Sequence, residues 1–119
     1  MFVRIVHHWC KPGRVQDGRD HMDKVGQSTS AAPGFLFRFR MENPDDPSLL
    51  TTMTVWQDRD AFTDFQAGRK PSSHADPANP FERMESQTFG VTGMAGDFAG
   101  LAAPGGRRAR RAPTETPQL

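Results

Sequence analysis

Residues 35–65 read FLFRFRMENPDDPSLLTTMTVWQDRDAFTDF, and this stretch decides the fold. Over residues 35–42, Phe and Met alternate with Leu, Arg and Glu, which is the two-residue period of a strand with one apolar and one charged face. The turn residues at 43–47, NPDDP, separate it from a second extended segment at 49–56. The sequence therefore predicts an antiparallel hairpin. One face of its second strand carries Thr52, Thr54 and Trp56.

A short helix is predicted directly after this hairpin. Asp58 is a suitable N-cap because its carboxylate can accept a hydrogen bond from a backbone N–H of the first turn. The apolar side chains of Ala61, Phe62 and Phe65 then recur at helical spacing, and Gly68 marks the end. We expect this helix to pack its aromatic stripe against the sheet.

The remaining elements lie on either side of this central part. Residues 2–10 have the composition of a strand, and apolar residues at three- and four-residue steps over 15–29 predict a helix that two internal glycines weaken. The proline-rich residues 69–80 predict a loop that carries His74, and residues 81–94 a fourth strand. Alternation in the first strand places on one face Val3, Ile5, His7 and Trp9, and on the other Phe2, Arg4, Val6 and His8.

The resulting order is β-α-β-β-α-β, which predicts an α+β, ferredoxin-like fold with an antiparallel four-stranded sheet and two helices on one face. The uncovered face is left for a second copy, so we expect a homodimer. Residues 1–96 form the predicted domain. Residues 97–119 are rich in Gly, Ala, Pro and Arg and are expected to be a flexible tail, with solvation more common for such a basic segment than contact with nucleic acid.

Composition limits the classes of partner. Fifteen Lys and Arg against fourteen Asp and Glu give a formal charge of +1, so no overall field attracts nucleic acid or an anionic membrane. No apolar run has the ~20 residues of a membrane helix. The single cysteine, Cys10, cannot form an internal disulfide, and no apolar leader opens the chain, so we expect a cytoplasmic protein.

Three motifs carry a family resemblance: KPG at 11–13, APGFL at 32–36 and TVWQDRDAFTDF at 54–65. Together they make residues 2–94 similar to the antibiotic biosynthesis monooxygenase family, whose members are dimeric α+β barrels. This resemblance implies an oxidoreductase of the monooxygenase type. The family includes enzymes that oxidise polyaromatic phenols to quinones without a cofactor, enzymes that degrade haem, and members without known activity, so function must be argued from the site.

Resemblance to the quinone-forming branch implies a pocket role for Trp56. Where active members have an Asn and a Tyr, this chain has Thr52 and Phe62, and the absence of any Tyr excludes a mechanism that needs a phenolic hydroxyl. Resemblance to the haem-degrading branch implies that His74 is the proximal iron ligand. That branch also has a Trp where this chain has Phe65, so haem could be bound without being degraded.

We therefore expect a monooxygenase, most simply without a cofactor, that oxidises a planar aromatic substrate with O₂ between sheet and helices. Its proton acceptor would be His7 or His74, because imidazole titrates near neutral pH. The expected pocket walls are Phe37, Phe39, Trp56, Phe62 and Phe65, with Thr52 beside them. The alternatives are a haem enzyme with His74 on the iron and a non-catalytic ligand-binding dimer. No other metal ligand is predicted, since His7 and His8 point to opposite faces.

Two further alternatives stay open at this stage. Trp56 is as readily an ordinary core residue as a pocket wall, and His74 more readily a solvated loop residue than a ligand. Arg38 and Arg40 share one face of their strand. There they bind an anionic ligand, form cross-strand pairs in a dimer interface, or are paired at the solvent-exposed surface.

Overall fold

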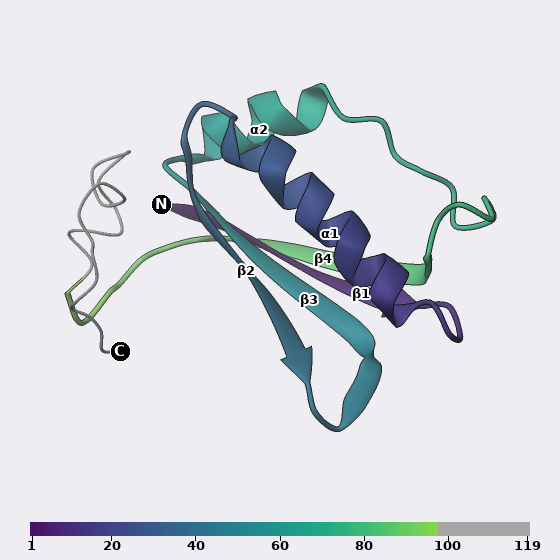
Figure 1. The fold of residues 1–119 in the computed structure, drawn as a ribbon. Coiled ribbons are helices and arrows are strands. Elements are labelled where there is room, and N and C mark those ends of the chain that lie inside the picture. Colours follow the sequence, from purple (N-terminus) through teal and green to yellow (C-terminus); the bar gives the residue numbers. More distant parts are fainter. Residues whose placement is uncertain (98–119) are drawn as a thin grey trace.

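The computed structural model describes residues 1–97, and both helices lie over the same side of one sheet (Figure 1). The elements are β1 Phe2–Cys10, α1 Val15–Ser30, β2 Phe35–Asn43, β3 Asp46–Trp56, α2 Arg59–Ala67 and β4 Phe81–Gly90. The four strands are antiparallel in the order β2-β3-β1-β4. The predicted ferredoxin-like α+β fold is confirmed. The predicted tail falls largely on residues 98–119, outside the described part.

The two central strands, β1 and β3, determine which residues face the helices. Phe2 lies opposite Trp56, and two residues further along each strand Arg4 lies opposite Thr54. The even-numbered side chains of both strands therefore point toward α1 and α2, as the period of two requires. The odd-numbered side chains form the other side of the sheet, which we call the open face.

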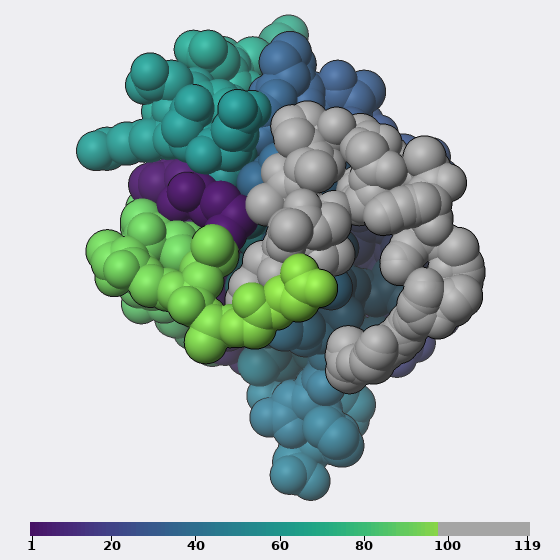
Figure 2. All heavy atoms as spheres, turned by 90° about the vertical axis from the view of Figure 1, so that its left-hand side faces the viewer, coloured from purple at the N-terminus to yellow at the C-terminus, as the bar shows by residue number. Residues whose placement is uncertain are grey.

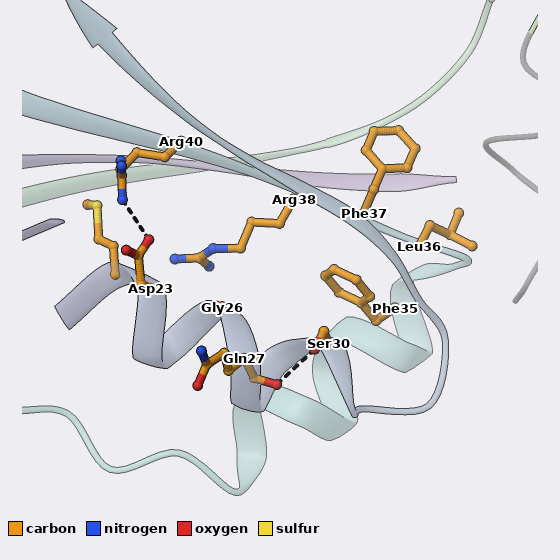
Figure 3. A pocket seen from close by; sticks show the side chains of 10 residues that line it. Asp23, Gly26, Gln27, Ser30, Phe35, Leu36, Phe37, Arg38 and Arg40 are labelled. Atoms are coloured by element: carbon orange, nitrogen blue, oxygen red, sulfur yellow. Dashed lines mark hydrogen bonds and ion pairs between the residues drawn. The ribbon is translucent and has the colours of Figure 1, made fainter. Parts of the chain in front are cut away.

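A β-bulge at Leu36 changes the expected faces of β2. Phe35 pairs with Trp56, but Phe37 already pairs with Val55, so one extra residue is inserted at Leu36. Phe35 consequently faces the helices, whereas the ring of Phe37 points to the open face (Figure 3). The prediction of an unbroken alternation from Phe35 to Met41 was wrong at its first step.

The core has two parts. Near the start of α1, Cys10, Met22, Leu50 and Phe81 pack together with Val15 against them. Near α2, an aromatic cluster contains Phe2, Phe35, Trp56, Phe62 and Phe65, with ring centroids 5.1–6.3 Å apart for its contacting pairs. Trp56 is central to this cluster and only 1% exposed. This packing holds α2 on the sheet.

Gly34, in the turn between α1 and β2, lies close against α2. Gly34 has φ of +83°, and a Cβ at this position would lie 2.4 Å from the Cβ of Ala61 on α2. Its carbonyl oxygen accepts a hydrogen bond of 2.7 Å from the backbone N–H of Gln57. Only glycine fits at position 34, both in conformation and in space.

The predicted N-cap of α2 is confirmed, since Asp58 Oδ1 accepts from the N–H of Ala61 at 2.9 Å.

The hairpin of β2 and β3 extends beyond the other strands, and its tip projects from the body of the molecule (Figure 2). Residues 43–46 form the turn at that tip, where Asn43 Oδ1 accepts from the N–H of Asp45 at 2.9 Å. None of the helices in residues 1–97 is long and apolar enough to cross a membrane.

Candidate functional site

A cavity of about 630 Å³ lies between α1 and β2. It is lined by Met22, Asp23, Gly26, Gln27 and Ser30 of α1 and by residues 35–38 and Arg40 of β2 (Figure 3). Gly26 faces Arg38, and a Cβ at Gly26 would lie at an ordinary contact distance of 3.4 Å from Nε of Arg38. Phe35 connects this cavity with the aromatic cluster. The cavity therefore has an aromatic end and a strongly polar side.

The two arginines of β2 point toward α1 and differ in their partners. Nη1 of Arg40 donates to Asp23 Oδ1 at 2.6 Å, and its Nε lies 3.5 Å from Glu42. Arg38 instead donates from Nη1 to Thr54 Oγ1 at 3.4 Å. Both side chains are on the helix side of the sheet, and the ion pairs of Arg40 are formed within the subunit. Arg40 is neutralised within the subunit and Arg38 is not.

Two more guanidinium groups reach the same region. Arg4 on β1 lies with its Cζ 5.7 Å from the ring centroid of Phe62, and Arg69 lies 5.5 Å from that of Phe65. Burial, and then the charge of Arg69, lowers the pKa of Arg4. The same two causes, followed by the charge of Arg4, lower the pKa of Arg38. The helix side of the sheet is thus electropositive.

His8 is the histidine that this electropositive region surrounds. Its ring stacks against Phe81 at 4.4 Å, and its Nδ1 is buried with no hydrogen-bond partner among the described residues. The pKa of His8 is lowered to about 4, first by burial and then by the charges of Arg38, His21, Arg4 and His74. The imidazole is therefore uncharged at neutral pH, with a nitrogen available to accept a proton.

The predicted acceptor His7 lies on the open face. Its Nδ1 is 2.8 Å from Oγ1 of Thr51 on the neighbouring strand. Placing His7 in the pocket between sheet and helices was wrong, because adjacent residues of a strand point to opposite faces. The alternation that groups His8 with Arg4 was visible in the sequence and is the signal that identifies His8 as the inward residue.

His74, the second predicted acceptor, is exposed in the loop between α2 and β4. This loop is anchored by Lys11 Nζ, which donates to the carbonyl oxygen of Asp76 at 3.1 Å, and by Arg14 Nη1, which donates to that of Pro77 at 3.1 Å. His74 is close enough to influence His8 electrostatically but does not line the cavity.

The predicted aromatic walls divide between the two faces of the sheet. Trp56, Phe62 and Phe65 pack together in the aromatic cluster. Phe37 and Phe39 are in contact with each other on the open face, at 5.4 Å between ring centroids, and Phe39 is 47% exposed. The expected hollow lined by all five rings is absent from the described structure. Phe35 joins the aromatic cluster and lines the cavity, which Phe37 also lines, and Thr52 is buried without lining it.

The chain matches the family model for antibiotic biosynthesis monooxygenase over residues 1–70. No curated protein sequence matches it significantly. Among solved structures, it is similar to SnoaB, a cofactor-independent oxygenase from Streptomyces nogalater, with TM-score 0.65 and 19% identity, covering 81% of this chain and 98% of that one. It is also similar to a variant of MhuD with two manganese protoporphyrin IX bound per active site, with TM-score 0.66 and 17% identity, covering 82% and 100%.

A third structure, Rv0793 from Mycobacterium tuberculosis, has TM-score 0.64 and 17% identity, covering 80% of this chain and 98% of that one. At these identities the likeness concerns the fold, a ferredoxin-like α+β domain that holds its cavity between sheet and helices. The family match spans more than half of the chain. The protein belongs to the antibiotic biosynthesis monooxygenase family.

Proposed function

We propose that this protein is a cytoplasmic, homodimeric monooxygenase that oxidises a planar aromatic substrate with O₂ and without a cofactor. The observation that carries the proposal is His8, a half-buried, uncharged imidazole whose Nδ1 is buried without a hydrogen-bond partner in the described chain; it is on the same side of the sheet as the cavity but does not itself line it. A base beside positive charge is what a reaction through a substrate anion needs. Membership of the monooxygenase family and the precedent of SnoaB support the same reaction class.

The reaction suits a polyaromatic phenol with a reactive CH₂ group between two rings. His8 removes one proton from that carbon, and the resulting anion is spread over the aromatic system. The positive charges that lower the pKa of His8 are offset as the anion forms, so proton transfer becomes more favourable along the reaction. The guanidinium groups of Arg4 and Arg38 stabilise the anion.

The anion then supplies the electrons that activate O₂. One electron passes to O₂, and the superoxide formed combines with the carbon radical, which creates the C–O bond. The peroxide takes the proton back from His8. Loss of the second C–H proton and cleavage of the O–O bond then release water and leave a carbonyl. The balance is CH₂ plus O₂ to C=O plus H₂O, in which the substrate carbon supplies all four electrons.

Haem does not fit the described cavity as a resident cofactor. His74, the histidine that the resemblance implies as the iron ligand, is exposed and is not among the residues that line the cavity. The α1 and β2 walls carry the charged side chains of Asp23, Arg38 and Arg40, where the flat faces of a porphyrin need apolar contact. The proposed reaction therefore has no step through haem, and hemin is one of the ligands in the test below.

The open face supports the proposed homodimer. Three apolar side chains on it, Phe39, Met41 and Phe89, are 47%, 40% and 48% exposed. Together with the half-buried Ile5 and Met53 they form an apolar surface of the kind that marks a protein interface. A second copy of the chain is the occupant we propose, because two such sheets would bury each other's apolar side chains.

The test is oxygen uptake by purified protein with anthrones and naphthols in the presence of a metal chelator. We expect uptake, with His8→Gln lowering kcat by about a hundredfold or more. His7→Gln and His74→Gln are matched controls, one on the open face and one in the exposed loop, and both should stay close to the wild-type rate.

Two results would contradict the proposal. A hemin titration that gives a Soret band dependent on His74 would favour a haem protein. Absence of oxygen uptake with anthrones, naphthols and hemin would favour a non-catalytic ligand-binding dimer.

A further inference from the structure

A row of polar side chains crosses the helix side of the sheet. Arg38 on β2 lies opposite Thr54 on β3, and Thr54 lies opposite Arg4 on β1. Adjacent strands are about 4.8 Å apart, so the two arginines start about 10 Å from each other with the threonine between them. Arg38 already extends toward β3, since its Nη1 is 3.4 Å from Thr54 Oγ1. The row thus places two guanidinium groups on either side of the hydroxyl of Thr54.

Arg4 and Arg38 are partly buried and form no ion pair among residues 1–97, whereas the other arginines without one in that part of the chain, Arg59 and Arg69, are exposed. Arg14, Arg19, Arg40 and Arg83 each form an ion pair with an Asp or Glu side chain. Like charges held together away from water repel, and the lowered pKa values of Arg4 and Arg38 have this repulsion as one cause. An anion would relieve it.

Two of these groups lie near aromatic rings of α2. Cζ of Arg4 is 5.7 Å from the ring centroid of Phe62, and Cζ of Arg69 is 5.5 Å from that of Phe65, which is within the range of a cation–π attraction. Arg38 lines the cavity opposite Gly26, where a Cβ would lie at an ordinary contact distance of 3.4 Å from Nε of Arg38. The cavity therefore gives access to the Arg38 end of the row.

We infer that the natural substrate carries a permanent carboxylate, which binds over Thr54 between Arg4 and Arg38. The inference rests on the proposed function for the aromatic part of the substrate and adds the chemical class of its anchoring group. A carboxylate matches the site because it offers two coplanar oxygens to two planar forks.

The experiment compares binding of anthraquinone-2-carboxylate with that of anthraquinone-2-carboxamide by isothermal titration calorimetry. Both are oxidised skeletons, so no turnover is required. We expect the wild-type protein to bind the carboxylate about tenfold to a hundredfold more tightly, as charge-assisted hydrogen bonds imply. Arg4→Met and Arg38→Met should each remove most of this preference, and Arg38→Lys should restore part of it. Arg59→Met, an exposed residue at the start of α2, should keep it in full.

Equal affinity of the wild-type protein for the two ligands would overturn the inference, and so would a preference that survives in the Arg4→Met, Arg38→Met double variant. The wild-type comparison decides even if a variant fails to fold. The outcome is also separable from that of the proposed reaction. Carboxylate preference without oxygen uptake would contradict only the oxygenase, and oxygen uptake on neutral anthrones without any carboxylate preference would contradict only the anchoring group.

Discussion

His8 owes its chemistry to its surroundings, because its Nδ1 has no bonding partner in the described chain. Burial disfavours the imidazolium, and so do the charges of Arg38 on β2, His21 on α1, Arg4 on its own strand and His74 in the loop between α2 and β4. All of these act in the same direction. The lowered pKa keeps the imidazole unprotonated at neutral pH but also makes it a weaker base than an ordinary histidine, so in the proposed reaction proton transfer to it depends on the substrate anion that forms beside it.

The low pKa of His8 predicts a specific acid sensitivity. Its folded-state pKa of about 4 is below the ordinary value of 6.5, so between these values the unfolded chain binds a proton that the native state does not. Stability contributed by this group is present above the unfolded pKa and is lost as the pH falls. We expect the wild-type protein to lose about 2 kcal/mol from this source between about pH 7 and about pH 5.

Urea unfolding at the two pH values measures this effect. Loss of stability through the carboxylates is common to all variants, so the comparison is with His8→Gln. The unfolding free energy of this variant should fall by about 2 kcal/mol less than that of the wild type over the same pH range. His7→Gln should behave as wild type. Parallel losses in wild type and His8→Gln would show that His8 titrates normally in the folded protein.

At the scale of the element, α1 contains two glycines with different reasons for being there. A Cβ on Gly18 would lie 2.9 Å from Sγ of Cys10 and 3.1 Å from Leu50, in the closely packed core. A Cβ on Gly26 would meet only the Arg38 side chain, at 3.4 Å. The first glycine permits close packing of helix on sheet, whereas the second keeps the cavity open.

The same substitution should therefore have opposite effects at the two positions. Gly26→Ala should stabilise the protein by about 0.5–1 kcal/mol, because alanine favours the helix and the flexible Arg38 can move aside. Gly18→Ala should destabilise it by about 1–3 kcal/mol, because overpacking of the core exceeds the gain in helix propensity. Urea unfolding of both variants provides the measurement. Equal effects of the two substitutions would mean that α1 does not pack as described.

The cap of α2 offers a second test at this scale. Asp58→Ala removes the acceptor for the N–H of Ala61 and should cost about 1 kcal/mol of unfolding free energy. Asp60→Ala, in the same exposed first turn but without the capping bond, is the matched control and should change stability much less. If both variants unfold alike, the general charge of the helix start matters and the capping bond does not.

At the scale of the whole molecule, the open face should control assembly. Phe39→Asp places a charge in the apolar surface of the proposed dimer, so we expect it to shift the protein from dimer to monomer in analytical ultracentrifugation. Lys24→Asp, on the exposed side of α1, should leave the dimer intact. A wild-type protein that sediments as a monomer at micromolar concentration, or a Phe39→Asp variant that remains dimeric, would contradict this interface.

The element order, the hairpin and the cap of α2 could be predicted because each depends on residues close together in the chain. Alternation in β1, the turn at 43–47 and Asp58 before the aromatic stripe are local signals, and they match the observed boundaries closely. The fourth strand was less well bounded. It ends at Gly90 and not at residue 94, since beyond Gly90 the ladder with β1 stops.

Which residues share the cavity depended on the tertiary structure. A one-residue bulge at Leu36 reverses the faces of β2 relative to an unbroken strand beginning at Phe35, and no local signal marked it. The helices then cover the side that holds His8 and Arg38, and leave out the side that holds His7 and Phe39. The sequence of a strand shows which residues share a face of the sheet. Only the packing of other elements determines which of its two faces is enclosed, because that choice is made by contacts between residues far apart in the chain.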